Sequence, residues 1–228
     1  MLSKVLSNNS LPCYRKIGGK HMSFSKNLFS NTKKPQGLMG KMMVNSMNKG
    51  HANVSDWGMS KLPAKAYQTI ADLGCGGGRN VQELLKKHPQ ANVTAVDYSE
   101  ISVNKTTKLN ADAISNGRLA VLQADVSNLS LPSNAYDLVT AFETIYFWPG
   151  PKQSFEEVYR ILKPNSYFLI VNEADGLNEK DNKWVEIIDG MCIYQMDELK
   201  NYLTKVGFRE VTIFHEKSKH WAAFLAKK

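Results

Sequence analysis

A run of glycines is the part of the sequence whose residue types and spacing most clearly indicate chemistry. Residues 74–78 read Gly-Cys-Gly-Gly-Gly and directly follow a short β-prone segment. Glycines lack a Cβ atom, so the backbone can turn tightly and come close to a ligand. The helix expected to begin near Arg79 would point its backbone N–H groups towards that ligand. The run therefore predicts a ligand-binding turn.

The spacing of these glycines discriminates between classes of ligand. The dinucleotide fingerprint needs a third small residue at the position that Arg79 occupies, and an arginine there would obstruct close helix–strand packing. No Gly-Lys-Ser or Gly-Lys-Thr follows the turn, so the sequence lacks the phosphate-binding loop of ATPases and GTPases. NAD, FAD and nucleoside triphosphates are therefore disfavoured.

The elements that must position this turn alternate between strand and helix. Apolar, β-prone runs predict strands at 69–73, 93–96, 119–123, 136–141 and 167–172, and helical periodicity predicts helices at 79–87, 101–114 and 154–162. Such alternation predicts a parallel sheet with helices on both faces. The glycines lie at the carboxyl edge of this sheet, where open α/β sheets bind ligands.

The C-terminal part of the chain changes this pattern. A helix is predicted at 196–206, ended by Gly207, and strands at 210–215 and 221–226 are joined by a polar turn. This hairpin adds an antiparallel edge to the sheet. The predicted fold class is α/β, a doubly wound, mostly parallel seven-stranded sheet with an antiparallel C-terminal hairpin.

The stretch Ala71-Asp72-Leu73-Gly74-Cys75-Gly76-Gly77-Gly78 resembles the acid-x-Gly-x-Gly-x-Gly motif of the class I methyltransferases that use S-adenosylmethionine (SAM). Segments at 93–99, 123–126, 136–143 and 160–164 match that family in the same order. The family usually continues with Gly-Gly where this chain has Asn165-Ser166, and asparagine tolerates left-handed geometry. The resemblance covers residues 69–172 and implies a Rossmann-like fold with SAM as the cofactor.

The resemblance also implies which residues bind the cofactor. Asp97 would accept hydrogen bonds from both ribose hydroxyls, which suits an acceptor-only carboxylate; capping of the next helix is the alternative role. The Asp125 carboxylate would accept a hydrogen bond from the adenine amine. The alternative is that Asp125 is a solvated carboxylate in a loop. The predicted cofactor-binding residues are Asp72, Gly74, Cys75, Gly76, Gly78, Asp97, Tyr98, Asp125, Val126 and Phe142.

The acceptor site is expected in the loop after the fourth strand, at 143–149. Methyl transfer from a sulfonium needs alignment and exclusion of water, with a base only where the acceptor must lose a proton. Glu143, His51 and Tyr146 are the catalytic candidates, and a structural role is the alternative for each. The predicted substrate-binding residues are Trp57, Tyr146, Trp148, Glu173 and Tyr194, and no metal ligand is predicted.

The N-terminal head differs in composition from the rest of the chain. Residues 1–55 carry nine Lys or Arg and no acid, whereas residues 56–228 carry 20 basic and 21 acidic residues. Residues 1–40 are predicted to be mostly disordered, and residues 41–228 to form the methyltransferase domain, with a short helix at 42–47 and a lid helix at about 41–65. The head has three interpretations: translation that starts at Met22, a mitochondrial leader at 1–21, or a solvated tail.

Composition also limits the choice of partners. The near-neutral domain argues against nucleic acid, because binding to a phosphate backbone needs a basic face, and no apolar run approaches the roughly 20 residues that span a membrane. The three cysteines form no C-x-x-C pair, and a cytoplasmic protein, monomeric or homodimeric, is expected. The sequence favours a small-molecule methyl acceptor; a non-catalytic protein that binds SAM or S-adenosylhomocysteine and an RNA methyltransferase are the alternatives.

Overall fold

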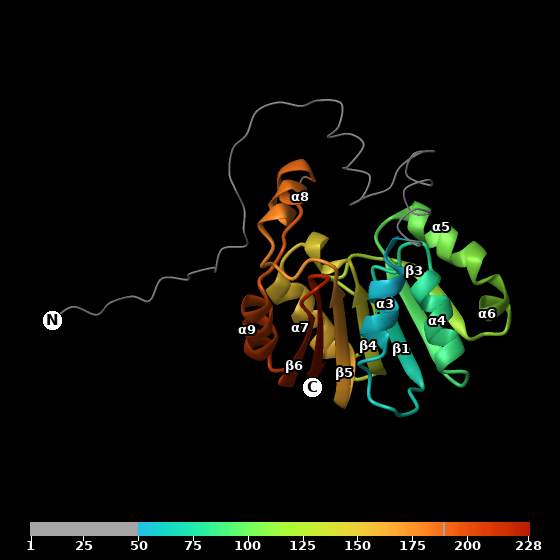
Figure 1. Ribbon diagram of the computed structural model, residues 1–228. Helices are drawn as coiled ribbons and strands as arrows, with labels where there is room; N and C mark the ends of the chain where they lie inside the picture. The colour runs from blue at the N-terminus through green and yellow to red at the C-terminus, as the bar shows by residue number, and fades with distance from the viewer. Residues whose placement is uncertain (1–49, 189) are drawn as a thin grey trace.

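The structure, a computed structural model, describes residues 50–188 and 190–228 (Figure 1). Its strands are β1 (Thr69–Leu73), β2 (Asn92–Asp97), β3 (Leu119–Gln123), β4 (Tyr136–Phe142), β5 (Leu162–Asn172), β6 (Arg209–Glu216) and β7 (Trp221–Lys227). Its helices are α3 (Ala52–Met59), α4 (Arg79–Lys87), α5 (Glu100–Leu109), α6 (Ala111–Ser115), α7 (Pro151–Ile161), α8 (Asn182–Ile187) and α9 (Met196–Val206), with short 3-10 turns η1 (Ile145–Phe147) and η2 (Glu179–Asp181).

These strands form one seven-stranded sheet in the order β3-β2-β1-β4-β5-β7-β6. Strands β1 to β5 pair in parallel, while β7 runs antiparallel to β5 and to the edge strand β6. The predicted fold class, including the C-terminal hairpin, is confirmed. Because the parallel strands all end at one edge, the loops that follow β1, β2, β4 and β5 meet there.

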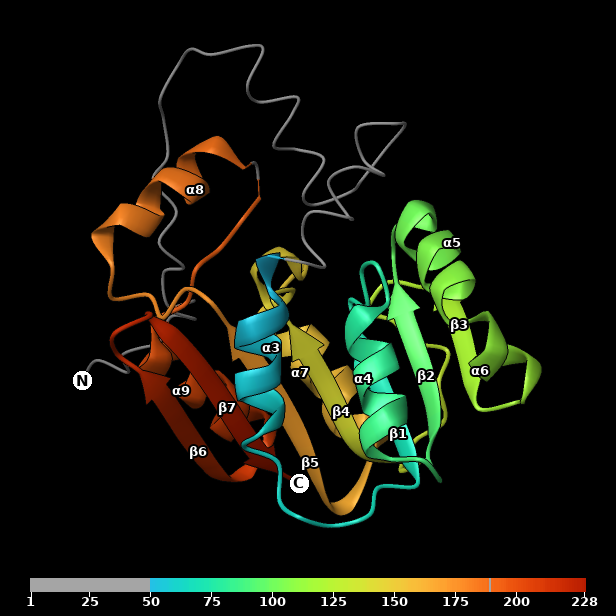
Figure 2. The ribbon, with the colours of Figure 1, turned by 45° about the vertical axis from the view of Figure 1, so that its right-hand side comes forward.

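Helices cover both faces of the sheet, as Figure 2 shows. Helices α3 and α4 pack on one face, where Val54, Leu84 and Leu169 belong to one buried cluster. Helices α7 and α9 pack on the other, where Phe155 and Leu203 belong to a second cluster. The central strands are therefore buried on both sides, which explains why they are continuous apolar runs rather than alternating ones.

The helix predicted at 101–114 is interrupted in the structure. Helix α5 ends at Leu109 and α6 begins at Ala111. The buried Asn110 between them turns its amide to the Gly78 carbonyl at 3.2 Å and the Thr106 carbonyl at 3.1 Å. Asparagine side chains compete for backbone carbonyls in this way, and the break fastens α5 to the glycine turn.

Strand β5 begins earlier than the predicted 167–172. Leu162 already pairs with Tyr136, and the register then shifts before Tyr167 pairs with Leu138. Asn165 lies between these two pairings and has a left-handed φ of 62°. Its backbone N–H donates to the Lys228 carbonyl at 3.0 Å. The asparagine thus adopts the geometry expected for the usual glycine.

Helix α3 is the described part of the predicted lid at 41–65. The predicted head and the predicted helix at 42–47 lie outside the described residues. Helix α3 packs on β5, and the two backbones come close because Gly58 faces Val171. Among the described helices, none has the length and apolar character needed to cross a membrane.

Gly58→Ala tests this packing of α3 on the sheet. A Cβ atom at Gly58 would lie 2.2 Å from Val171 Cγ2, so α3 must shift. Overpacking of this kind costs about 1–3 kcal/mol, and denaturant unfolding should show that loss. Gly50→Ala is the matched control, since a Cβ there meets nothing within 4 Å; equal stabilities of the two variants would contradict the packing described.

Candidate active site

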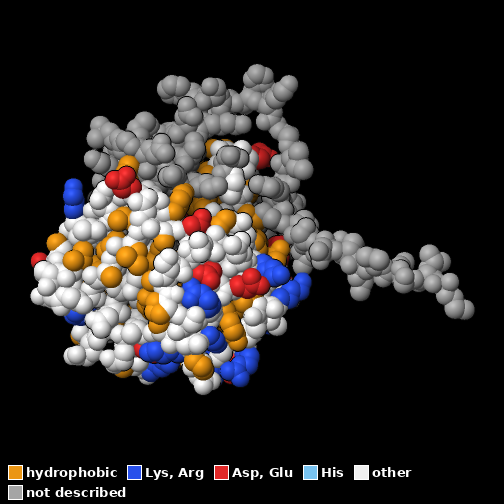
Figure 3. Space-filling view, turned by 180° about the vertical axis from the view of Figure 1, so that it is seen from behind, with side chains coloured by type: hydrophobic (Ala, Val, Ile, Leu, Met, Phe, Trp, Pro, Cys, Tyr) orange, Lys and Arg blue, Asp and Glu red, His pale blue; other side chains and the backbone are white. Residues whose placement is uncertain are grey.

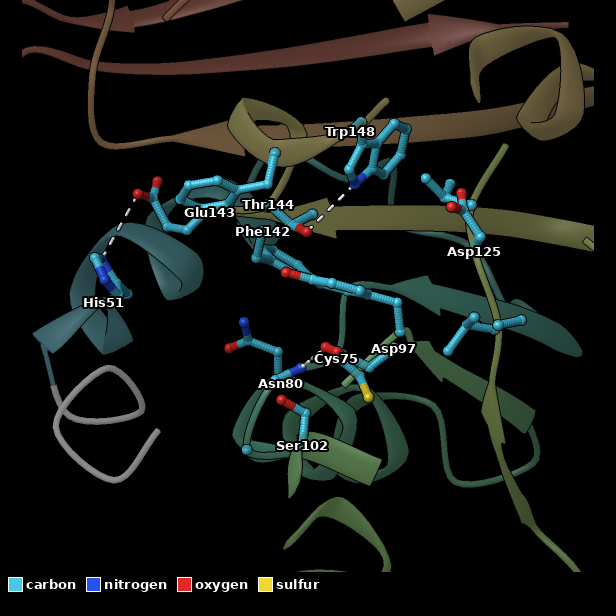
Figure 4. Close-up of a pocket in the computed structure, with 18 of the residues that line it drawn as sticks. His51, Cys75, Asn80, Asp97, Ser102, Asp125, Phe142, Glu143, Thr144 and Trp148 are labelled. Carbon is cyan, nitrogen blue, oxygen red and sulfur yellow. Dashed lines mark hydrogen bonds and ion pairs between the residues drawn. The ribbon is translucent and has the colours of Figure 1, made fainter. Parts of the chain in front are cut away.

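A cavity of about 440 Å³ opens at the carboxyl edge of the sheet. Its size falls within the roughly 300–1,000 Å³ usual for sites that hold small ligands and cofactors. Eight of the ten predicted cofactor-binding residues line it, namely Gly74, Cys75, Gly76, Asp97, Tyr98, Asp125, Val126 and Phe142. Figure 4 shows His51 and Glu143 at one end of this cavity and Asp125 at the other.

The glycine turn forms the floor of the cavity. Gly74 has a φ of 79°, and a Cβ atom on it would lie 2.0 Å from Thr144 Oγ1. Gly76 also has a positive φ of 53°, but a Cβ there meets no atom within 4 Å. A side chain at position 74 would clash with Thr144 of the neighbouring loop, so this position requires glycine. At Gly76 the space beside the backbone is open.

Asp97 holds the turn in place from the end of β2. Its Oδ2 accepts a hydrogen bond from the Gly76 N–H and its Oδ1 accepts one from the Ser99 N–H, each at 2.9 Å. Burial raises the pKa of the Asp97 carboxyl, although these two backbone donors oppose the shift. The Ser102 side chain also forms a hydrogen bond to this carboxylate, and its remaining acceptor capacity is available to a ligand.

The other end of the cavity is lined by Tyr98, Asp125 and Val126. The Tyr98 hydroxyl is buried and has no hydrogen-bond partner among the described residues. The Asp125 carboxylate accepts bonds from the Ser127 N–H and hydroxyl at 2.8 and 2.7 Å through Oδ1, and none is found on its Oδ2 within the described chain. Unpartnered polar groups in a cavity are ready to bind a polar ligand.

The predicted cofactor fits these residues. SAM carries a ribose diol for the carboxylate of Asp97, and the bare backbone at Gly76 leaves room for a ligand to approach closely. A planar adenine ring can lie beside the apolar Val126, with its amine within reach of a carboxylate such as that of Asp125. The orphan hydroxyl of Tyr98 supplies one more polar contact at that end.

Asp72, a predicted cofactor residue, does not line the cavity. It is buried in β1, where its Oδ1 accepts a 2.7 Å hydrogen bond from the Thr140 hydroxyl. Burial raises its pKa to about 7, and the nearby Asp97 adds to the increase. Gly78 is also outside the cavity lining, because it packs against Thr106 of α5, whose Cα would lie 2.8 Å from an added Cβ.

Asp72→Asn should therefore alter how stability depends on pH. The pKa in the folded state, about 7, is above the ordinary value of 3.8, so the contribution of Asp72 to stability is largest at low pH and is lost as the pH rises towards and through 7. Asparagine keeps the acceptor for Thr140 but does not ionise. As the pH rises from about 4.5 to about 8, the free energy of unfolding of the variant should therefore increase by about 2–4 kcal/mol relative to that of the wild type.

Urea unfolding of both proteins across this pH range measures that difference. A free-energy difference that does not change with pH would show that Asp72 titrates near its ordinary value, and the burial argument would then fail.

The acceptor end of the cavity brings together three predicted residues from separate elements. His51 precedes α3, Glu143 follows β4 and Glu173 follows β5. His51 Nδ1 lies 2.9 Å from Glu173 Oε2 and 3.7 Å from Glu143 Oε2, and the Glu173 N–H donates to Glu143 Oε1. Glu143 has a left-handed φ of 57°, a conformation that costs energy and tends to occur at functional sites.

Burial and charge shift the pKa values at this end. Burial raises the pKa of Glu143 to about 8, with the charge of His51 opposing the change and that of Glu173 adding to it. Burial alone would lower the pKa of His51, but the contact with Glu173 and the charges of both glutamates raise it above its ordinary value. His51 and Glu143 line the cavity, whereas Glu173 is not among its lining residues and is half exposed.

The aromatic residues of the loop after β4 divide between cavity and core. Phe147 and Trp148 line the cavity, and Trp148 also stacks on Phe168 and donates from Nε1 to Thr144 Oγ1 at 3.3 Å. Tyr146 does not line the cavity: it is buried, and its hydroxyl accepts the Ala174 N–H at 3.0 Å. Burial raises the pKa of Tyr146 far above its ordinary value. Its position favours the structural alternative, and its catalytic role stays a prediction.

Two further predicted substrate residues also lie away from the cavity. Trp57 of α3 is partly buried, and its ring packs against Trp221 of β7 at a centroid distance of 5.9 Å. Tyr194 packs edge-on against Tyr202 of α9 at 6.1 Å. The partner of Trp57 is distant in sequence, so no local pattern could have indicated its packing. The predicted substrate roles of both residues stay predictions.

The structure adds lining residues that sequence reasoning missed. Arg79 lines the cavity and forms an ion pair with Asp56 at 2.7 Å, and the neighbouring Asn80 donates to Ser55 Oγ at 3.2 Å. These bonds fasten α3 to the start of α4 and so hold His51 at the cavity. A charged residue directly after a glycine turn was the available signal, but no local pattern indicates Asp56 as its partner.

Comparisons with known proteins relate this chain to methyltransferases. Residues 71–170 match the family described as a methyltransferase domain. An O-methyltransferase of Pyrenophora dematioidea is 26% identical over 155 residues, covering 66% of this chain and only 58% of that protein's length. The fold resembles a chain in the complex of the Haloferax volcanii Trm112 methyltransferase activator with a methyltransferase, with a TM-score of 0.74, 18% identity and coverage of 82% and 93%.

Human N-acetylserotonin methyltransferase, solved in complex with SAM, has the same fold, with a TM-score of 0.69, 15% identity and coverage of 83% of this chain and 56% of that one. The sheet order and the cavity define a Rossmann-like domain of the SAM-binding type. Residues 71–170 are therefore similar to the methyltransferase domain family, and the fold is that of SAM-dependent methyltransferases of known structure.

Proposed function

We propose that this protein is an enzyme that transfers the methyl group of SAM to a small-molecule acceptor. One observation carries the proposal: a single cavity joins the cofactor residues at the glycine turn to the polar pair His51 and Glu143. When bound, SAM supplies an electrophilic methyl group on a sulfonium. The residues of this chain then have to align the acceptor and keep water out.

The acceptor end suits a small, partly aromatic molecule. Phe142, Phe147 and Trp148 provide apolar lining that excludes water and can contact a planar ring. His51 and Glu143 provide the polar contacts that fix its orientation. A cavity with an apolar lining and a few convergent polar groups is the usual form of a small-molecule site.

The charge on the face shown in Figure 3 gives little support to a nucleic-acid acceptor. Figure 3 shows Lys and Arg side chains on the far face in small groups, interspersed with acidic side chains rather than joined into one basic surface. Binding to a phosphate backbone gains its affinity from several basic contacts at once. The names of two relatives, an O-methyltransferase and N-acetylserotonin methyltransferase, also fit a small acceptor.

The test is transfer of labelled methyl from SAM by the full-length protein. The protein is incubated separately with a small-metabolite fraction, with total RNA and with a protein extract, and Asp97→Ala serves as the control that lacks the proposed cofactor contact. We expect label in the small-metabolite fraction with the wild type alone. Label in RNA would identify an RNA methyltransferase instead, and SAM binding by calorimetry without label in any fraction would identify a non-catalytic binding protein.

A further inference from the structure

The side chains of His51, Glu143 and Glu173 form a compact cluster at the acceptor end of the cavity. One ligand atom from each, an imidazole nitrogen and two carboxylate oxygens, lies within 4.8 Å of the others. They come from the start of α3 and from the carboxyl ends of the adjacent strands β4 and β5. The fold of the sheet therefore brings nitrogen and oxygen donors together beside the cavity, and Figure 4 shows two of these residues, His51 and Glu143.

The contacts inside this cluster differ from those of an ordinary hydrogen-bonded pair. His51 Nδ1 is shielded from solvent and makes no hydrogen bond, although Glu173 Oε2 is only 2.9 Å away. Glu143 is oriented by the Glu173 N–H through Oε1, and its Oε2 faces His51 at 3.7 Å, beyond hydrogen-bond distance. His51 Nδ1 and the carboxylate oxygens of the two glutamates therefore lie close together, but the geometry is not that of a well-directed N–H···O hydrogen bond.

The spacing of the donor atoms suits a common metal ion. Bonds of about 2.0–2.2 Å from imidazole and carboxylate to Zn²⁺ place neighbouring ligand atoms roughly 3–4 Å apart. The distances of 2.9 and 3.7 Å from Nδ1 to the two carboxylate oxygens fall in that range. Nothing more than small side-chain movements is needed to bring the three donors to one ion.

Charge also favours a cation here. The Glu143 side chain is only 9% exposed, and no Lys or Arg among the described residues forms an ion pair with either glutamate. Buried carboxylates are normally paired with a cation or a metal. In the metal-free protein His51 is the cation beside the two glutamates. Metal binding releases protons from its ligands, and a divalent ion would then balance the charges of the two ionised carboxylates.

We propose that His51, Glu143 and Glu173 bind one divalent metal ion of the Mn²⁺ to Zn²⁺ series. Within this series, imidazole ligands favour the later ions and carboxylate ligands the earlier ones. A site with both kinds of ligand therefore suits an ion of this series better than Mg²⁺ or Cu⁺. Three protein ligands leave coordination positions open towards the cavity. The next step rests on the proposed function. The open positions would bind an oxygen of the acceptor, and the metal ion would lower the pKa of the acceptor's hydroxyl group.

Metal binding by the full-length protein tests the cluster without SAM or acceptor. After treatment with a chelator, the protein is titrated with Mn²⁺, followed by electron paramagnetic resonance, and with Co²⁺, followed by visible absorption. We expect one bound ion, and binding at least about tenfold weaker in His51→Gln, Glu143→Gln and Glu173→Gln, as for loss of a ligand or its support. His88→Gln is the control, because this histidine follows α4 at the opposite edge of the sheet.

The SAM affinity of each variant, measured without metal, reports whether it has folded, because the cofactor end of the cavity lies apart from the cluster. Absence of one-to-one binding, or equal binding by the wild type and all three variants, would overturn the metal site. If the ion binds but no methyl is transferred to any small molecule, the site stands and the proposed function fails instead.

Discussion

Asp97→Ala is expected to weaken SAM binding by about 100-fold, because hydrogen bonds to a charged acceptor are worth about 1.5–3 kcal/mol and two ribose hydroxyls lose theirs. The variant also removes the acceptor for the Gly76 N–H at 2.9 Å. Isothermal titration with SAM measures the loss. The exposed Asp112→Ala on α6 is the matched control and should bind SAM like the wild type.

The stability of Asp97→Ala separates a binding role from a structural one. Burial raises the pKa of Asp97, so its ionised form costs the folded protein energy near neutral pH when no ligand is present. We therefore expect the ligand-free variant to melt close to the wild type despite its lost affinity. A large drop in melting temperature together with unchanged SAM affinity would show that Asp97 serves the loop and not the cofactor.

Glu143→Gln is expected to have the largest effect on turnover. Glu143 is the buried carboxyl group at the acceptor end. Glutamine cannot exchange a proton with the reacting groups, but it keeps an oxygen for the Glu173 N–H. Removing a positioned group of this kind lowers rates by about 10²–10⁴-fold. Single-turnover transfer of labelled methyl to the accepting small-molecule fraction measures the effect.

The affinity for SAM distinguishes this effect from misfolding. Glu143→Gln should bind SAM within about threefold of the wild type, because an interaction at the acceptor end acts on the reaction rather than on cofactor binding. The exposed Glu179→Gln is the matched control for the substitution itself. Wild-type turnover in Glu143→Gln would exclude Glu143 from the acceptor site.

Much of the fold could be predicted because local patterns and tertiary structure agree. The predicted bounds of β1, β3, α4 and α9 match the structure, since each apolar run or helical stripe ends at a glycine or a polar turn. The single helix predicted at 101–114 was wrong. Its break at Asn110 depends on the Gly78 carbonyl, 32 residues away in sequence, and no local pattern contains that contact.

The site was only partly predictable for the same reason. The cofactor residues follow the ends of strands, so their positions could be inferred from the strands themselves. Tyr146 lies in the expected loop, yet its hydroxyl is taken by the Ala174 N–H beyond β5. His51, Glu143 and Glu173 were each singled out by type, but their approach to one another depends on how α3 crosses the sheet.

The orientation of SAM in the cavity is the most direct test of the whole account. With a ¹³C-labelled methyl group on SAM, nuclear Overhauser effects identify the protons that surround the transferable methyl in the complex. Contacts to His51 and Thr144, at the end near Glu143, are the predicted result. Contacts from the methyl to Val126, with none to His51, would place the cofactor the other way round and contradict the assignment of the two ends of the cavity.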